Sequence, residues 1–394
     1  MNKKSLLNVN IRNKRVLIRV DFNVPIDKNG DITDDKRILE ALPTIEYLIK
    51  NDAKIILMSH LGRPKGSVKE ELRLKPVAER LGRLLKKPVI KLDDCIGPEV
   101  EEAVNTMNAG DVMLLENLRF HKEETENDPD FAKKLAMLGD IYVNDAFGTC
   151  HRAHASTEGV THFLQAVSGF LVQKEIEYFE KIISSPERPF ALVLGGAKVA
   201  DKIPVIENML SKVDMILIGG AMAYTFLKHS GKETGSSICE EDMISVVSSL
   251  MDEARDKKVD IFLPEDHIVC DNLDAPKEIK TTEGPDISEG FIAADIGPKT
   301  IETFKKQILK VKTIVWNGPM GIFERDEFSK GTEEIAKAIA ESSAVSVVGG
   351  GDSAAAAKKF HVDDKISHIS TGGGASLEYL EGKSLPGIVA LEDL

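Results

Sequence analysis

Residues 15–24 have the sequence RVLIRVDFNV, an almost continuous apolar run that ends in polar side chains. A short run rich in branched residues is typical of a strand covered on both faces, as in a parallel sheet. The next segment, 37–51, has the apolar spacing of an amphipathic helix, and 53–59 is again a short apolar run. This strand–helix–strand order predicts an α/β fold.

The same alternation of short strands and amphipathic helices continues along the chain. Further strands are expected at 88–92, 111–116, 141–146, 190–194, 214–218, 260–263, 312–316 and 344–348. Further helices are expected at 75–87, 99–108, 130–138, 201–212, 241–257, 298–309, 331–341 and 353–360. The pattern predicts parallel sheets with helices on both faces.

A boundary between two domains is predicted near the middle of the chain. A long helical pattern, 171–183, ends at Ser184-Ser185-Pro186, and Pro189 follows before the next strand. Proline stops a helix because it lacks the backbone N–H and clashes with the preceding turn. We therefore expect two α/β domains joined by a helix, with a hinge at these prolines.

Composition and charge limit the possible functions. The 394 residues are enough for two or three domains with cores of their own. Hydrophobic residues make up 42% and charged residues 29%, which is typical of a folded globular protein. Acidic residues number 64 against 51 basic ones, a net charge of −13 that argues against non-specific binding to nucleic acids or membrane surfaces. The longest uncharged apolar stretch, 215–227, is too short to span a bilayer.

The cysteines and the N-terminus indicate a cytoplasmic protein. None of Cys95, Cys150, Cys239 and Cys270 belongs to a Cys-x-x-Cys pair, so the sequence predicts neither a zinc motif nor a redox motif. Scattered thiols of this kind are typical of reduced cytosolic proteins. The first residues contain no apolar core of a signal peptide.

Arginine and histidine side chains follow the ends of the strands in the first half. The carboxyl ends of parallel strands lie at one edge of a sheet, so these side chains should converge. The planar fork of arginine binds phosphate or carboxylate, which predicts a site for a strongly anionic ligand. A single arginine there would more often be solvated or ion-paired, but four of five strand ends carry one. The polar residues concerned are Asp21, Asn23, Arg37, His60, Arg63, Arg119, His151, Arg152 and His154.

Glycine-rich turns follow the strands of the second half instead, at 195–198, 219–220, 317–321 and 349–353. Small residues let a phosphate chain approach the backbone, and free N–H groups at the start of a helix favour anions. Lys198 and Lys202 would share one face if the turn were already helical. Asp352 offers a hard oxygen ligand for Mg²⁺. We predict a nucleotide site with a metal ion.

Two standard nucleotide-binding motifs offer alternatives to this kind of site. The chain has no Walker A sequence. Residues 349–354 match G-x-G-x-x-A between a strand and a helix, but fewer than 45 residues follow them. A dinucleotide fold would need a second βαβ half there, so a dehydrogenase is disfavoured.

Seven segments are distinctive when taken together. They are RVDFNVP at 19–25, HLGRP at 60–64, ENLRF at 116–120, NDAFG at 144–148, GGAKV at 195–199, WNGP at 316–319 and GGDS at 350–353. In this order, and over almost the whole chain, they resemble the phosphoglycerate kinase family. The resemblance implies two Rossmann-like domains with parallel β-sheets flanked by helices, facing across a cleft and joined by an interdomain helix. The implied divisions are 1–170 for substrate binding, 171–185 for the interdomain helix, 186–375 for nucleotide binding and 376–394 for a tail returning to the first domain.

The resemblance also implies a reaction. The acyl phosphate of 1,3-bisphosphoglycerate would pass reversibly and directly to ADP with Mg²⁺, giving 3-phosphoglycerate and ATP, in glycolysis and gluconeogenesis. Hinge closure would bring the two ligands together. We expect a monomer with small-molecule partners, and no nucleic-acid or membrane partner.

The motif match extends to individual residues. The implied substrate-binding residues are Asp21, Asn23, Arg37, His60, Leu61, Gly62, Arg63, Arg119 and Arg152. The implied nucleotide-binding residues are Gly196, Ala197, Lys198, Lys202, Gly219, Ala293, Asn317, Pro319, Glu324, Gly350, Gly351, Asp352 and Ser353, with Asp352 as the metal ligand. The implied catalytic residues are Arg37, Lys198 and Lys202.

Two other functions are alternatives to catalysis. A non-catalytic nucleotide sensor on the same fold would be indicated by loss of Arg37, Lys198 or Asp352, and all three are present. A secondary role in nucleic-acid binding is disfavoured by the net charge. For Arg37 itself, the alternative to a catalytic role is a surface salt bridge to Asp34 or Asp35.

Overall fold

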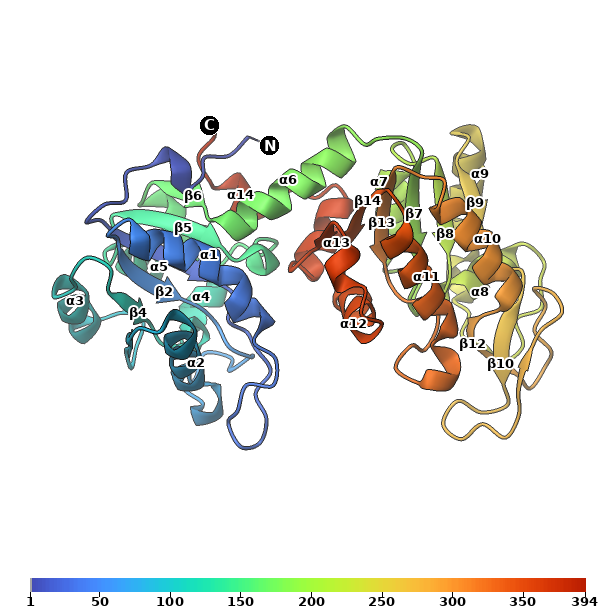
Figure 1. The fold of residues 1–394 in the computed structure, drawn as a ribbon, viewed down its shortest axis with the longest axis horizontal. Helices are drawn as coiled ribbons and strands as arrows, with labels where there is room; N and C mark the ends of the chain where they lie inside the picture. The colour runs from blue at the N-terminus through green and yellow to red at the C-terminus, as the bar shows by residue number, and fades with distance from the viewer. Residues whose placement is uncertain (1) are drawn as a thin grey trace. The chain divides into compact units, whose positions relative to one another are not determined.

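The computed structural model describes residues 2–394 (Figure 1). The chain divides into two units, of which the first extends to Glu177 and also contains Ser384–Leu394, and the second comprises Tyr178–Lys383. Each unit has a six-stranded sheet, and the predicted α/β fold with two parallel sheets is confirmed. Across residues 2–394, no helix combines the length and the apolar character that a membrane span would need.

The sheet of the first unit is parallel throughout, in the order β3-β4-β2-β1-β5-β6. β1 pairs with β2 on one side and with β5 on the other. The strands that follow β1 therefore extend the sheet on one side, and the chain later returns to add β5 on the other side of β1. Open α/β sheets bind ligands at such a switch point, beyond the carboxyl ends of the strands. The strands are β1 (Arg15–Val20), β2 (Lys54–Met58), β3 (Val89–Lys91), β4 (Val112–Leu114), β5 (Ile141–Asp145) and β6 (Ala166–Ser168).

Two amphipathic helices, α1 (Lys36–Lys50) and α2 (Lys75–Leu85), share a core with one face of this sheet. Ile38 and Leu48 of α1 pack in the same cluster as Val16 and Ile18 of β1, all fully buried. Alternate residues of a strand face the same side, so Val16 and Ile18 belong to the face of β1 that packs on the helices. The other helices between the strands are α3 (Pro98–Asn105), α4 (Lys122–Glu126) and α5 (Pro129–Ala136).

The division between the units falls within α6 (Phe170–Ser184), which contains the predicted helical segment 171–183. Its first turn is held by the first unit, because Asp145 Oδ1 accepts a hydrogen bond from the backbone N–H of Leu171 at 2.8 Å. Its later residues pack within the second unit, where Tyr178 stacks on His368 with ring centres 4.5 Å apart. Residues before and after Glu177 are therefore anchored to different cores.

The sheet of the second unit is also parallel, in the order β15-β14-β13-β7-β8-β9. β7 lies between β13 and β8, which places a second switch point between β7 and β13. The strands are β7 (Phe190–Leu194), β8 (Met215–Ile218), β9 (Asp260–Phe262), β13 (Thr313–Asn317), β14 (Val345–Val348) and β15 (His368–Ile369). The helices are α7 (Ile203–Met209), α8 (Met222–His229), α9 (Ile244–Asp256), α10 (Pro298–Ile308), α11 (Lys330–Glu341), α12 (Gly351–Lys359) and α13 (Gly374–Leu380).

The second unit also contains an antiparallel sheet that the sequence pattern did not predict. Its order is β11-β10-β12, formed by β10 (His267–Cys270), β11 (Ile279–Thr281) and β12 (Ile292–Ile296). These strands have three to five residues, and β11 is exposed along its whole length. A strand so short and so little buried carries no usable hydrophobic period.

One helix was not predicted, and one local expectation fails. The sequence pattern predicts a strand at 214–218, which matches β8, but it does not predict α8, which begins at Met222 in the same apolar stretch. The turn that carries Lys198 is not helical, since α7 starts at Ile203 and Lys202 is only its N-cap residue. The conditional expectation that Lys198 and Lys202 share a helix face is therefore wrong.

The end of the chain forms part of the first unit. The short helix α14 (Pro386–Val389) places Gly387 against β5 and the loop that follows it, and Asn144 Nδ2 in β5 donates to Gly387 O at 3.0 Å. The Gly387 N–H donates to Cys150 O at 2.9 Å. Leu385 and Ile388 are fully buried there.

Candidate active site

A pocket of about 300 Å³ in the first unit is lined by cationic side chains from separate loops. Arg63 follows β2, Arg119 lies in the 3-10 helix Leu118–Phe120, and Arg152 follows β5. Lys65 joins them, and none of the described residues 2–394 that line the pocket is acidic. Such a pocket favours an anionic ligand with several oxygen atoms, because guanidinium groups bind carboxylate and phosphate in a bidentate manner.

Arg119 has an unused donor in this pocket. Its Nη1 donates to Gly62 O at 2.9 Å, but its Nε is buried without a hydrogen-bond partner among residues 2–394. Burial, with Arg19 and Arg152 nearby, lowers the pKa of Arg119 to about 10, so the group remains cationic near neutral pH. A buried unpaired donor costs free energy unless a ligand accepts from it. An anionic ligand bound in the pocket would supply the acceptor that Arg119 Nε lacks.

His60 is held in one tautomer by a buried arginine. Arg19 is fully buried, and its Nη2 donates to His60 Nδ1 at 3.1 Å. Arginine has no acceptor, so Nδ1 must be unprotonated and the proton of neutral His60 lies on Nε2. Burial lowers the pKa of His60 well below its usual range, and the charges of Arg19, Arg119, Arg37 and Arg152 lower it further. His60 is therefore a neutral hydrogen-bond donor at physiological pH.

The turn after β1 carries the remaining polar groups of this edge. Asp21 Oδ2 pairs with Arg37 Nη1 from the first turn of α1. Asn23 Oδ1 accepts from the Gly62 N–H at 2.9 Å, and Gly62 O accepts from Arg119. The turns after β1, β2 and β4 are thus joined by hydrogen bonds at one edge of the sheet.

A polar pocket of about 630 Å³ lies at the switch point of the second unit. Its walls include the backbone of Gly196 and Ala197 after β7 and of Gly318 after β13, and the side chains of Lys198, Lys202, Asp201 and Asp352. The turns touch closely, because the Gly196 N–H donates to Pro319 O at 3.0 Å. A Cβ at Gly195 would collide with the carbonyl of Pro319, so this position needs glycine.

An apolar pocket of about 260 Å³ adjoins the polar one, and both are lined by Gly196, Ala197, Pro319 and Asp352. Its own walls are mainly apolar and come from separate elements. They are Tyr224 of α8, Ile238, Leu273, Ile292, Ala293, Ala294 and Ile322. A polar pocket continuous with an apolar one suits a nucleotide, with its phosphates in the first and its base in the second.

Lys202 is the more enclosed of the two lysines. Its Nζ donates to Asn317 Oδ1, and Asn317 Nδ2 donates to Gly349 O at 2.7 Å. Burial lowers the pKa of Lys202. Ser353 Oγ accepts from the Gly318 N–H at 2.6 Å. The turns after β7, β13 and β14 are therefore linked through side chains.

A family model described as phosphoglycerate kinase matches residues 6–383. The chain belongs to the phosphoglycerate kinase family. It is 58% identical over 399 residues to the phosphoglycerate kinase of Dictyoglomus turgidum and 55% identical over 395 residues to that of Moorella thermoacetica, with 100% of each chain covered in both comparisons. The family assignment makes it a kinase.

Solved structures of the phosphoglycerate kinase family agree with this assignment. The enzyme from Coxiella burnetii matches with a TM-score of 0.90 at 43% identity over 98% of both chains. The enzyme from Pyrococcus horikoshii matches with a TM-score of 0.82 at 36% identity, again over 98% of both chains. The predicted resemblance to phosphoglycerate kinase is confirmed.

The residues predicted from the phosphoglycerate kinase motifs lie at these two sheet edges, and their roles stay predictions. Arg63, Arg119 and Arg152 line the cationic pocket. Asp21, Asn23, His60, Leu61 and Gly62 lie on the turns after β1 and β2, and Arg37 lies in the first turn of α1. Gly196, Ala197, Lys198, Lys202, Ala293, Pro319, Glu324 and Asp352 line the two pockets of the second unit. Gly219 and Gly350 lie on the adjoining turns, Asn317 ends β13, and Gly351 and Ser353 lie in the first turn of α12. Gly220 rather than Gly219 lines the apolar pocket.

The sequence motifs of this phosphoglycerate kinase family member did not identify every residue at these sheet edges. Arg19 lies inside a strand, where the alternation marks it as a core position and gives no signal of contact with His60. Tyr224, Ile238 and Leu273 come from segments with no recognisable motif, and the fold alone brings them to the apolar pocket. Lys65 lies three residues beyond Gly62, so extending the HLGRP segment would have found it.

Proposed function

We propose that this chain catalyses the reversible transfer of the acyl phosphate of 1,3-bisphosphoglycerate to ADP, giving 3-phosphoglycerate and ATP. The supporting observation is the combination of pockets in this phosphoglycerate kinase family member. One unit has a cationic pocket, and the other unit has a polar pocket that adjoins an apolar one. The reaction joins a small, highly anionic acid to a nucleotide, so it needs one pocket of each kind.

The first unit would hold the glycerate ligand. Arg63, Arg119 and Arg152 supply the guanidinium groups for its charged oxygens, and the buried Nε of Arg119 gains the acceptor that it lacks. Neutral His60 can donate from Nε2 without adding to the charge. Asp21 and Asn23 hold Arg37 and Gly62 in position.

The second unit would hold the nucleotide, with its base in the apolar pocket and its phosphates along the glycine turns. The side chain of Asp352 fits Mg²⁺, because it is an exposed carboxylate in the first turn of α12 that lines both pockets. Mg²⁺ bound with the nucleotide would neutralise part of the phosphate charge.

Arg37, Lys198 and Lys202 would stabilise the phosphoryl group during transfer. Charge spreads over its three equatorial oxygens, and transfer needs alignment and charge neutralisation rather than a covalent intermediate. Because the two ligand sites lie on different units, we propose that the units close on each other during turnover. Closure would also exclude water, which otherwise hydrolyses an acyl phosphate. We further propose that the chain works as a cytoplasmic monomer.

A coupled assay with 3-phosphoglycerate and MgATP tests this proposal, with a metal-free reaction as its control. We expect turnover that requires both substrates and Mg²⁺. Nucleotide binding by calorimetry without turnover would instead support the non-catalytic sensor and contradict the proposal.

A further inference from the structure

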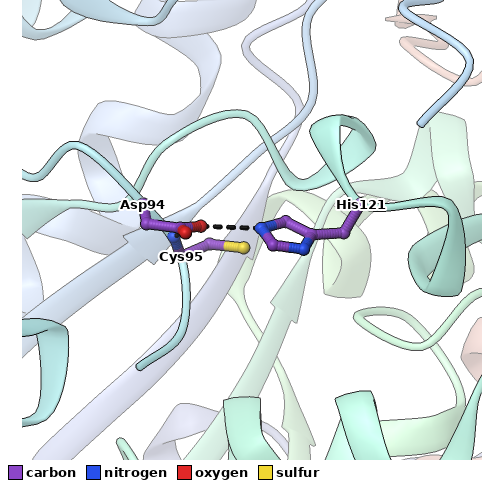
Figure 2. Close-up of side chains that lie close together, drawn as sticks. All are labelled: Asp94, Cys95 and His121. Carbon is purple, nitrogen blue, oxygen red and sulfur yellow. Dashed lines mark hydrogen bonds and ion pairs between the residues drawn. The ribbon is translucent and has the colours of Figure 1, made fainter. Parts of the chain in front are cut away.

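Three potential metal ligands, none of them assigned to either ligand site, meet in the first unit (Figure 2). Asp94 and Cys95 lie in the loop between β3 and α3, and His121 lies at the start of α4. His121 Nε2 and Asp94 Oδ1 share a hydrogen bond of 2.7 Å. The carboxylate oxygen, the thiol sulfur and the imidazole nitrogen all lie within 4.8 Å of one another.

The distance between Asp94 Oδ1 and His121 Nε2 suits coordination after a small adjustment. Zn²⁺ takes sulfur at about 2.3 Å and nitrogen or oxygen at about 2.0–2.2 Å, so tetrahedral ligand atoms lie roughly 3.3–3.7 Å apart. The cluster needs Asp94 Oδ1 and His121 Nε2 to separate by about half an ångström from 2.7 Å as the cation replaces their shared proton.

We propose that Asp94, Cys95 and His121 form a binding site for a borderline-soft divalent cation such as Zn²⁺, with a fourth position open to water. A thiolate with imidazole and carboxylate selects such a cation over Mg²⁺, which prefers oxygen ligands and keeps its own water. The site is therefore distinct in chemistry from the magnesium site proposed at Asp352. The spacing of 26 residues between Cys95 and His121 matches no zinc motif, which is why the sequence predicted none.

The surroundings hold two of the ligands in place. The Cys95 N–H donates to Asp94 Oδ1 at 2.6 Å, and the Glu116 N–H donates to Asp94 O at 3.2 Å, which ties the loop to the end of β4. The imidazole of His121 packs on the ring of Phe131 with centres 5.3 Å apart. Ligands oriented by such neighbours lose less freedom when a metal binds.

An ion could reach the cluster through its exposed side. The Cys95 side chain is fully buried, whereas Asp94 is exposed and His121 is partly exposed. Asp94 also lines a cavity of about 680 Å³ with Leu92, Ile96 and Gly97. A cation in this cavity would therefore meet the cluster at the Asp94 carboxylate.

Cobalt titration of the full-length, reduced, nucleotide-free protein tests the site. Co²⁺ takes the place of Zn²⁺ at thiolate sites and gives a charge-transfer absorption in the near ultraviolet. We expect this band to saturate at one Co²⁺ per chain and to disappear when one equivalent of Zn²⁺ is added. Cys95→Ser should abolish the band, and His121→Gln and Asp94→Asn should each weaken Co²⁺ binding by more than about tenfold.

A matched control comes from another cysteine of the same chain. Cys239 is partly exposed and lies in the other unit, so Cys239→Ser should leave the band unchanged. Zn²⁺ should raise the melting temperature of the wild type and of Cys239→Ser, but not of Cys95→Ser. If Cys95→Ser does not fold, X-ray absorption of the zinc-loaded wild type should still show one sulfur ligand.

Three results would overturn the proposal. One is the absence of a thiolate band at millimolar Co²⁺. Another is a band that survives Cys95→Ser and disappears with Cys239→Ser. The third is a zinc spectrum with oxygen and nitrogen ligands alone, which would reduce the cluster to an Asp94–His121 ion pair beside an inert thiol.

Discussion

Arg37 forms a weak ion pair that a ligand can displace. It pairs with Asp21, a partner that the surface alternative did not name. Asp35 instead accepts from Arg80 Nη2 at 2.6 Å. The Arg37 side chain is 40% exposed, and a pair of this kind contributes at most about 1 kcal/mol. A transferring phosphoryl group can therefore compete with Asp21 for the guanidinium.

Replacing Arg37 separates chemistry from binding. We expect Arg37→Ala to lower kcat by roughly 10³-fold or more with little change in KM, because the guanidinium meets charge that develops only in the transition state. Arg37→Lys should recover only part of the loss, since an ammonium lacks the planar fork. Steady-state kinetics of both variants measure this. A kcat within a few-fold of the wild type would leave Arg37 a binding or surface residue.

Asp352 should matter for the metal-dependent reaction more than for stability. The N-cap of α12 is Gly350, without a side-chain cap, and Asp352 lies in the first helical turn. Asp352→Ala should therefore cost roughly 0.3–1 kcal/mol of helix stabilisation while removing most Mg²⁺-dependent turnover. Melting curves and Mg²⁺ titrations of activity together measure it. Intact kinetics with a lower melting temperature would show that Asp352 acts only at the helix terminus.

His154 should make stability depend on pH. Burial, helped by the charges of nearby arginines, lowers its pKa from 6.5 to about 4 in the folded chain. The unfolded chain then binds the proton more readily, so stability is lost as the pH falls below about 6.5 and approaches 4. Between pH 7 and pH 5 the wild type should lose about 2 kcal/mol more unfolding free energy than His154→Gln. Urea unfolding at both pH values tests this, and parallel losses in the two proteins would contradict it.

At the scale of elements, α14 shows how a four-residue helix can stabilise a distant part of the sequence. Ile388 is fully buried in the first unit, while its neighbour Val389 is 52% exposed. Ile388→Ala should cost about 2–5 kcal/mol of unfolding free energy, because it leaves a cavity. Val389→Ala should cost less than about 0.5 kcal/mol and serves as the matched control. Equal effects of the two changes in denaturant unfolding would show that α14 does not pack as described.

At the scale of the whole molecule, the two proposed ligand sites belong to units with separate cores. Arg119 lines the cationic pocket of the first unit, and the pockets proposed for the nucleotide are lined by residues of the second. Arg119→Ala should therefore weaken 3-phosphoglycerate binding by at least tenfold, about 1.4 kcal/mol, and leave ATP affinity within about twofold. Calorimetry of each ligand alone measures both affinities. Parallel losses for the two ligands would point to a shared site or a folding defect.

The sequence by itself determined the fold class, the order of the main elements and the family. Strands such as β1 and β7 are short branched runs buried on both faces, so their pattern is visible without the fold. The arginine and glycine turns follow those strands directly, and parallel pairing places them at one edge. These features could be predicted because they depend on the hydrophobic period of each segment and on its position along the chain.

Tertiary structure alone decided what depends on contacts between distant segments. The helix α8 was missed because Met222–Leu227 are all buried, which removes the polar face that gives a helix its period. Arg19 and His60, 41 positions apart, meet only because β1 and β2 are neighbours. Asp94 and His121 likewise meet across the ends of β3 and β4. A sequence pattern records the local period of a segment, whereas the partner of a side chain is set by sheet order and packing.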